Sequence, residues 1–121
     1  MRKFSRERAL AARALRFRVA ASLVKIEAVN PARGYSLGTG VVVAPGAAVT
    51  NCHVTRDAAR IQLLWGGLRY PVVAQYADVN RDLCVLHVRQ LEVAPAPMAP
   101  RALRPGQRIV AAGFVGGQAL Q

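Results

Sequence analysis

The sequence predicts an all-β domain preceded by a short helix. Short apolar runs alternate in the manner of strands with one buried face, and turn residues separate them. No crossover helix is expected between these runs, so the pattern favours an antiparallel barrel or sandwich over an α/β sheet. The chain has 121 residues, 53% of them hydrophobic and 19% charged, which suits one globular domain with a modest core.

The first expected element is a short amphipathic helix over residues 6–21. Apolar residues at helical spacing indicate it, namely Leu10, Ala14, Phe17 and Ala21. Arginines occupy other positions around the same helix. Because the strand-like region begins only after it, the helix is expected to form an arm outside the β-domain.

This arm, residues 1–21, carries much of the positive charge. The formal net charge is +11, and residues 1–18 hold seven of the 17 Lys and Arg residues against one acid. A basic arm can contact nucleic acid or anionic lipid, but a solvated terminus is the favoured interpretation, so neither partner is expected. Arg13, Arg16 and Arg18 interrupt the apolar run of roughly 7–15 residues that a secretory signal needs, so no clear signal peptide is expected.

The region after the arm is predicted to contain seven strands. They are residues 23–29, 38–43, 47–50, 60–65, 70–76, 83–88 and 107–112. Turns are expected at residues 30–34, at Pro45-Gly46 and at Gly66-Gly67, where glycine or proline favours a reversal of the chain. Residues 91–105 contain four prolines, which exclude regular structure and indicate an extended surface connection.

Three segments carry the functional signal. Residues 38–43, G-T-G-V-V-V, form a glycine-marked entry into a buried strand. Residues 49–54, V-T-N-C-H-V, end a strand in His53. Residues 80–86, N-R-D-L-C-V-L, begin a strand with Asp82. Each segment alone is a weak signal, but the ordered set at this spacing is specific.

The set resembles the HtrA-type branch of the trypsin-like serine proteases. The match covers roughly residues 22–113, and residues 103–113 resemble that family's last strand of the first barrel. The resemblance implies a six- or seven-stranded Greek-key β-barrel over residues 22–113, with a truncated linker over residues 114–121. It also implies a serine endopeptidase that acts on proteins or peptides without a cofactor or metal, in a periplasmic or secreted location.

By this resemblance, His53 is the general base and Asp82 orients it. A serine hydroxyl is a weak nucleophile at neutral pH, and imidazole can accept its proton because its pKa lies near the working pH. A carboxylate fixes the imidazole tautomer and stabilises the imidazolium. Asp78 is the rival carboxylate, but no strand follows it directly. His87 lies on the strand face opposite to Asp82 and is expected to face solvent.

The serine is where the sequence departs from the family. The family's nucleophile lies in a G-x-S-G turn of a second barrel, which also supplies the oxyanion hole. The sequence has only Ser5, Ser22 and Ser36, all of which precede His53. We therefore expect the chain alone to be inactive, as a fragment of a protease.

Two other functions stay open at the level of the sequence. The first is a catalytically dead β-barrel that binds a protein partner, because a lone first barrel exposes the apolar face that a second barrel or another chain would cover. The second is a polyanion binder that acts through residues 1–18.

The two cysteines flank the expected catalytic pair. Cys52 precedes the base and Cys84 follows the orienting carboxylate by two residues, so a disulfide is a hypothesis beside two reduced, buried thiols. A zinc site made of these cysteines with His53 and His87 is disfavoured, because residues 52 and 53, and residues 84 and 87, point to opposite faces.

Overall fold

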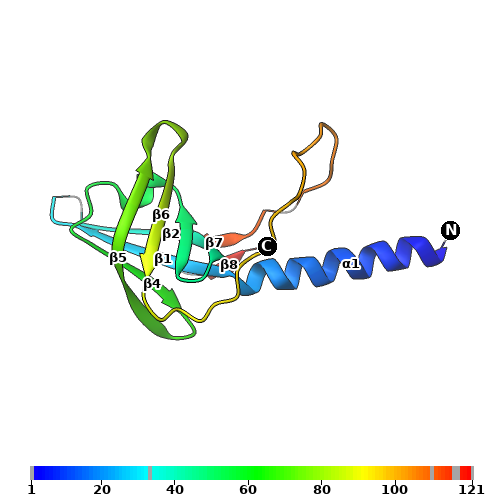
Figure 1. Ribbon diagram of the computed structural model, residues 1–121, viewed down its shortest axis with the longest axis horizontal. Coiled ribbons are helices and arrows are strands. Elements are labelled where there is room, and N and C mark those ends of the chain that lie inside the picture. The colour runs from blue at the N-terminus through cyan, green and yellow to red at the C-terminus, as the bar shows by residue number, and fades with distance from the viewer. Residues whose placement is uncertain (1, 33, 110, 116–117, 121) are drawn as a thin grey trace.

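The computed structural model describes residues 2–32, 34–109, 111–115 and 118–120. It consists of a barrel and one long helix that extends away from the barrel (Figure 1). Its elements in chain order are the helix α1 (Arg2–Ala21), the strands β1 (Leu23–Asn30), β2 (Gly34–Ala44) and β3 (Ala47–Thr50), the one-turn helix α2 (Cys52–Thr55), the strands β4 (Arg60–Trp65) and β5 (Leu68–Asp78), the 3-10 turn η1 (Val79–Arg81), and the strands β6 (Leu83–Val88), β7 (Gly113–Val115) and β8 (Gln118–Leu120).

Strands β1 to β6 form a closed barrel in the order β1-β2-β3-β6-β5-β4, and all of the pairings are antiparallel. Because β4 returns to lie beside β1, the order β4-β1-β2-β3 is that of a Greek key. The predicted all-β Greek-key barrel is therefore confirmed, with six strands. Strands β7 and β8 form a separate two-stranded sheet.

Most strand bounds follow the predicted runs, with one exception. Strands β3, β4 and β6 have the predicted bounds, and β1, β2 and β5 are longer than predicted. The prediction of a seventh strand over residues 107–112 is wrong. Residues 107–109 and 111–112 have no regular structure, and residue 110 lies outside the described residues. The reason is geometric, because a closed barrel offers this segment no free strand edge to pair with.

The barrel core consists of apolar side chains that alternate inward along the strands. Its buried members are Val24, Ile26, Val42, Ala48, Leu63, Leu86, Val88, Leu91 and Val93. The last two lie in the proline-rich connection, which was expected on the surface. Leu91 and Val93 are only 7% and 4% exposed, so the start of this connection is part of the core. Apolar burial of this kind is the main stabilising term of such a fold.

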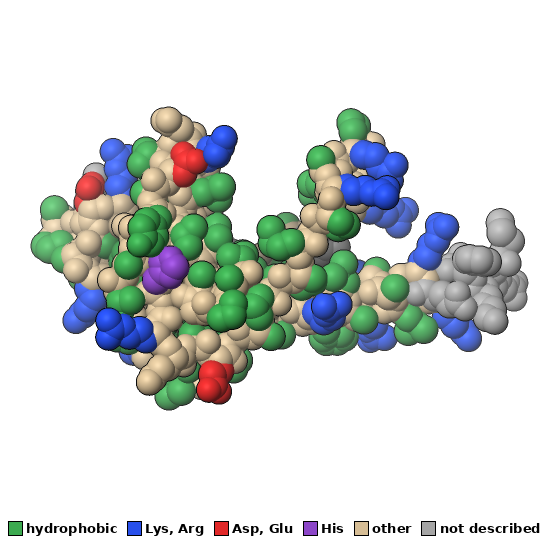
Figure 2. Space-filling view, viewed as in Figure 1, with side chains coloured by type: hydrophobic (Ala, Val, Ile, Leu, Met, Phe, Trp, Pro, Cys, Tyr) green, Lys and Arg blue, Asp and Glu red, His purple; other side chains and the backbone are tan. Residues whose placement is uncertain are grey.

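Helix α1 extends away from the barrel (Figure 1), and the basic side chains that the structure describes are spread along it (Figure 2). Arg6, Arg8, Arg13, Arg16 and Arg18 are all exposed. Within the described part of the chain, no helix combines the length and apolar character needed to cross a bilayer.

Candidate active site

The ends of β3 and β6 bring the two expected catalytic residues together. Thr50, the last residue of β3, pairs with Cys84 of β6. His53 comes three residues after Thr50 and Asp82 two residues before Cys84, so the antiparallel register places both at one rim of the barrel. The β3–β6 pairing thus positions two residues that lie far apart in the sequence.

His53 lies on α2 rather than at the end of a strand as expected. Asn51 is the N-cap residue of this single turn, and the backbone N–H of Val54 donates to the Asn51 carbonyl at 3.1 Å. Val54 packs against β2, where a Cβ built on Gly38 would lie 2.7 Å from both Val54 γ-carbons. The glycine of the G-T-G-V-V-V segment therefore makes room for the turn that carries His53.

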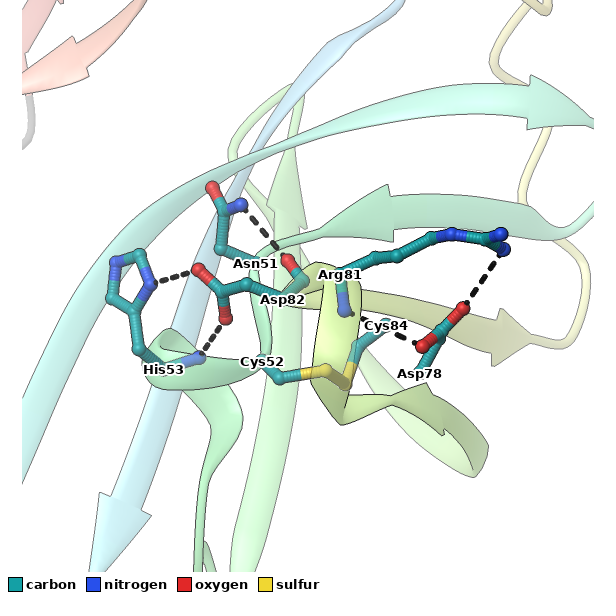
Figure 3. The surroundings of a disulfide bond; sticks show 7 residues. All are labelled: Asn51, Cys52, His53, Asp78, Arg81, Asp82 and Cys84. Atoms are coloured by element: carbon teal, nitrogen blue, oxygen red, sulfur yellow. Dashed lines mark hydrogen bonds and ion pairs between the residues drawn. A yellow bond between two sulfur atoms is a disulfide. The ribbon is translucent and has the colours of Figure 1, made fainter.

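His53 and Asp82 form a doubly hydrogen-bonded pair (Figure 3). The His53 ring nitrogen Nδ1 lies 2.6 Å from Asp82 Oδ2, and the His53 backbone N–H donates to Asp82 Oδ1 at 2.9 Å. The ring bond and then the backbone bond hold the pKa of the Asp82 carboxyl below its usual range. An ionised carboxylate can only accept, so Nδ1 is the ring nitrogen that donates in this bond, and in the neutral imidazole Nε2 is then the nitrogen with the lone pair. The two side chains are 69% and 44% exposed, which leaves the ring accessible.

Asp82 itself has an unusual backbone. Its φ of 53° and ψ of 42° lie in the left-handed region, between η1 and β6. Its N–H donates to the Val79 carbonyl at 3.2 Å. Its carbonyl accepts from the Asn51 side chain at 3.0 Å and from the Cys52 backbone N–H at 3.4 Å. Asn51 was not singled out from the sequence, although an asparagine between a strand and a helix is a typical N-cap signal.

A disulfide joins Cys52 and Cys84 next to this pair (Figure 3). Their Cα atoms are 5.1 Å apart, and the residues are 8% and 1% exposed. Each sulfur is therefore bonded to the other. His87 is half-buried and contacts the Tyr76 ring edge-on, with ring centroids 5.3 Å apart.

Asp78, the rival carboxylate, has a different partner. It accepts from the backbone N–H of Arg81 at 3.4 Å, and its other oxygen pairs with the Arg81 guanidinium at 3.2 Å. It therefore caps η1, and through η1 it supports the turn that leads into Asp82.

No serine whose side chain the structure describes is hydrogen-bonded to His53. Ser22 is 1% exposed and donates to the Ala94 carbonyl at 2.5 Å. Ser36 is exposed on β2, opposite Ala28 of β1. The remaining serine, Ser5, belongs to the part of α1 whose side chains are not described.

A shallow open hollow of about 350 Å³ lies elsewhere, between β4 and β5. Residues 58–62 and 71–75 line it, so it contains neither member of the His53–Asp82 pair. It opens where the β4–β5 pairing ends at Gln62 and Pro71.

Comparisons with known proteins agree on one family. The model of the trypsin-like peptidase domain matches residues 38–121. The serine protease Rv3671c of Mycobacterium tuberculosis H37Rv is 29% identical over 97 residues, which is 79% of this chain and 24% of that protein. The crystal structure of the active form of Rv3671c superposes with a TM-score of 0.82 at 26% identity, over 91% of this chain and 49% of that one.

A second solved structure shares the same fold. The serine endoprotease from Yersinia pestis superposes with a TM-score of 0.67 at 25% identity, over 76% of this chain and 35% of that one. The chain thus spans about half the length of the active-form Rv3671c structure and about a quarter of the curated sequence.

Proposed function

Because this chain belongs to the trypsin-like peptidase domain family, we propose that it supplies the general base and orienting carboxylate of a serine endopeptidase. The observation that carries the proposal is the short contact between His53 Nδ1 and the Asp82 carboxylate, 2.6 Å long, with the other ring nitrogen left accessible. This is the arrangement that serine activation requires.

In this mechanism, Nε2 of His53 takes the proton of a serine hydroxyl as the oxygen attacks the substrate carbonyl. The ring then becomes an imidazolium, and the Asp82 carboxylate stabilises its charge while holding its orientation. The same ring returns the proton to the leaving amine. In these steps, His53 and Asp82 are the residues that this chain contributes.

The nucleophile is assigned to a serine outside residues 1–121, on the same polypeptide or on another. Ser22 is buried against the Ala94 carbonyl, and Ser36 lies on β2 without a hydrogen bond to the pair in the described structure. Neither serine lies in a glycine-rich turn like the one that positions the family's nucleophile and oxyanion hole. The substrates are proteins or peptides, as for the family.

The test uses the protein expressed from its complete natural reading frame, with casein and a fluorescent peptide as substrates. We expect Asp82→Asn to lower kcat by about 10⁴-fold, because the amide stabilises the wrong imidazole tautomer. His53→Ala is expected to abolish measurable hydrolysis. His87→Ala, which changes the other histidine of the sequence, is the matched control and is expected to keep wild-type activity. Hydrolysis that persists in His53→Ala would contradict the proposal.

An inactive barrel that binds a protein partner is the second candidate. Large apolar side chains are exposed on the segments around the pair: Leu83, which follows Asp82, is 43% exposed, Val79, which begins η1, is 75% exposed, and Leu37, which precedes Gly38, is 46% exposed. Exposed apolar side chains favour contact with another protein surface. This candidate predicts no hydrolysis by the natural protein, together with a stable complex that is lost in Leu37→Asp and in Val79→Asp.

A further inference from the structure

The direction of the Asp82 carboxylate depends on a backbone conformation that needs support. A residue with a Cβ is disfavoured in the left-handed region, although Asp tolerates it better than most. Here φ of 53° and ψ of 42° turn the chain from η1 into β6. A rotation of this backbone would move the carboxylate away from the His53 ring, because the side chain follows its own Cα.

Two groups outside its own turn hold the Asp82 carbonyl. The Asn51 side-chain amide donates to it at 3.0 Å, and the Cys52 backbone N–H donates at 3.4 Å. The Asn51 bond has the usual length for N–H···O, whereas the Cys52 bond is long. The amide of Asn51 is thus the stronger of the two restraints on this carbonyl.

Asn51 occupies a position from which a side chain usually caps a helix. It is the N-cap residue of α2, with an extended backbone, and N-cap side chains usually accept a bond from the first turn of their own helix. Its side chain makes no such bond. Instead, the Asp82 carboxylate accepts the N–H of His53 in that turn at 2.9 Å. The two residues therefore exchange roles: Asp82 caps the turn that carries His53, and Asn51 holds the backbone of Asp82.

From this exchange, we propose that Asn51 is a positioning residue of the His53–Asp82 pair, whose side-chain amide fixes the left-handed backbone of Asp82 and so aims its carboxylate at the ring. Its effect on catalysis rests on the function proposed above. Its effect on the geometry of the pair does not.

The experiment compares four variants of the protein expressed from its complete reading frame. Asn51→Ala removes the amide, and Asn51→Asp keeps the size and the ability to cap but cannot donate to a carbonyl. Asn51→Gln keeps a donating carboxamide. Asn30→Ala is the matched control, because its side-chain oxygen accepts from the Ala32 N–H at 2.8 Å in the β1–β2 turn, apart from the pair.

The first readout is the low-field proton NMR resonance of the His53 Nδ1 proton, which requires the short bond to Asp82 and no substrate. We expect Asn51→Ala and Asn51→Asp to lose it, and Asn51→Gln and Asn30→Ala to keep it. The second readout is kinetic: kcat is expected to fall at least tenfold in Asn51→Ala and Asn51→Asp with KM within twofold of wild type.

A folded Asn51→Asp that keeps the resonance overturns the proposal, and this variant decides the matter if Asn51→Ala does not fold. Full hydrolysis by His53→Ala would instead overturn the proposed function, and the resonance would still decide the role of Asn51. Loss of the resonance in Asn51→Gln as well would also count against the proposal, because it would show that a donating amide is not what the site requires.

Discussion

Gly38 and Val54 are so close that a methyl group at residue 38 would lie 2.7 Å from both Val54 γ-carbons. Gly38 is not among the residues with positive φ, so alanine is excluded there by space and not by backbone conformation. We expect Gly38→Ala to lower the free energy of unfolding by about 1–3 kcal/mol, as overpacking does. Because Val54 follows His53, the variant is also expected to weaken the His53–Asp82 contact. Urea unfolding and the Nδ1 proton resonance measure the two effects.

The control for this prediction is the double variant Gly38→Ala, Val54→Ala. Removing the two γ-carbons creates the space that the new methyl needs, so the cost of Gly38→Ala in the Val54→Ala background should fall below about 0.5 kcal/mol. An equal cost in both backgrounds would show that Val54 is not the obstacle.

The lowered pKa of Asp82 makes the free energy of unfolding depend on pH in the acid range. The hydrogen bond from the His53 ring, and then the bond from the His53 N–H, lower the pKa of this carboxyl. As pH falls below about 4, the unfolded chain therefore takes up a proton at Asp82 before the folded chain does. The contribution of Asp82 is therefore complete above the unfolded pKa and is lost as pH falls through the folded pKa. We expect the stability difference between wild type and Asp82→Asn to shrink as pH falls from about 4 to 2.

Asp82→Asn suits this test because asparagine also tolerates a left-handed backbone. Every other carboxyl group is common to both proteins, so their difference isolates Asp82. Urea unfolding at several pH values is the measurement, and parallel stability curves would contradict the prediction.

The Cys52–Cys84 disulfide is expected to contribute about 2–4 kcal/mol, since it closes a loop between residues 32 apart in the sequence. The double variant Cys52→Ala, Cys84→Ala should unfold at a correspondingly lower urea concentration. Wild-type protein in strong reductant should behave like this double variant. A thiol count on denatured, unreduced protein from its native compartment checks the premise. Zero thiols are expected, and two would contradict the disulfide.

Glu27 is a buried carboxylate that depends on Arg69. Its side chain is 9% exposed, and both of its oxygens lie 2.9 Å from Arg69 Nη1. Arg69→Ala leaves this charge without its main partner, which should cost about 1–3 kcal/mol in urea unfolding. Arg81→Ala breaks an exposed pair with Asp78 and is the matched control, with an expected cost below about 1 kcal/mol. Equal costs for the two variants would contradict the role of burial.

Alternation predicted the strands whose two faces differ in burial. In β6, Cys84, Leu86 and Val88 are buried and the residues between them are not, so the pattern fixes both bounds. The first part of β2 carries no such signal: Tyr35, Ser36 and Leu37 are all exposed and form a strand because they pair with β1. For the same reason residues 107–112 alternate in sequence although the described residues among them, 107–109 and 111–112, form no strand, since pairing and not pattern completes a strand.

Within the candidate site, the sequence predicted the members of the His53–Asp82 pair but not what holds them. One turn of helix, such as α2, is too short to show a helical period. The part played by Asn51 depends on the left-handed backbone of Asp82, which is on another element and has no signature at residue 51. The closeness of Gly38 to Val54 depends on the packing of α2 onto β2, and no local pattern records it.

The barrel order, with β3 beside β6, also sets when the His53–Asp82 pair can first exist. During synthesis His53 emerges well before Asp82, and the two cannot meet until the sixth strand has left the ribosome and docked between β3 and β5. Contacts between segments so distant form slowly compared with the local β1–β2 hairpin. We therefore expect pulse-labelled hydrogen exchange during refolding to protect the β1–β2 amides before the His53 amide. The His53–Asp82 contact is then among the last parts of the barrel to form.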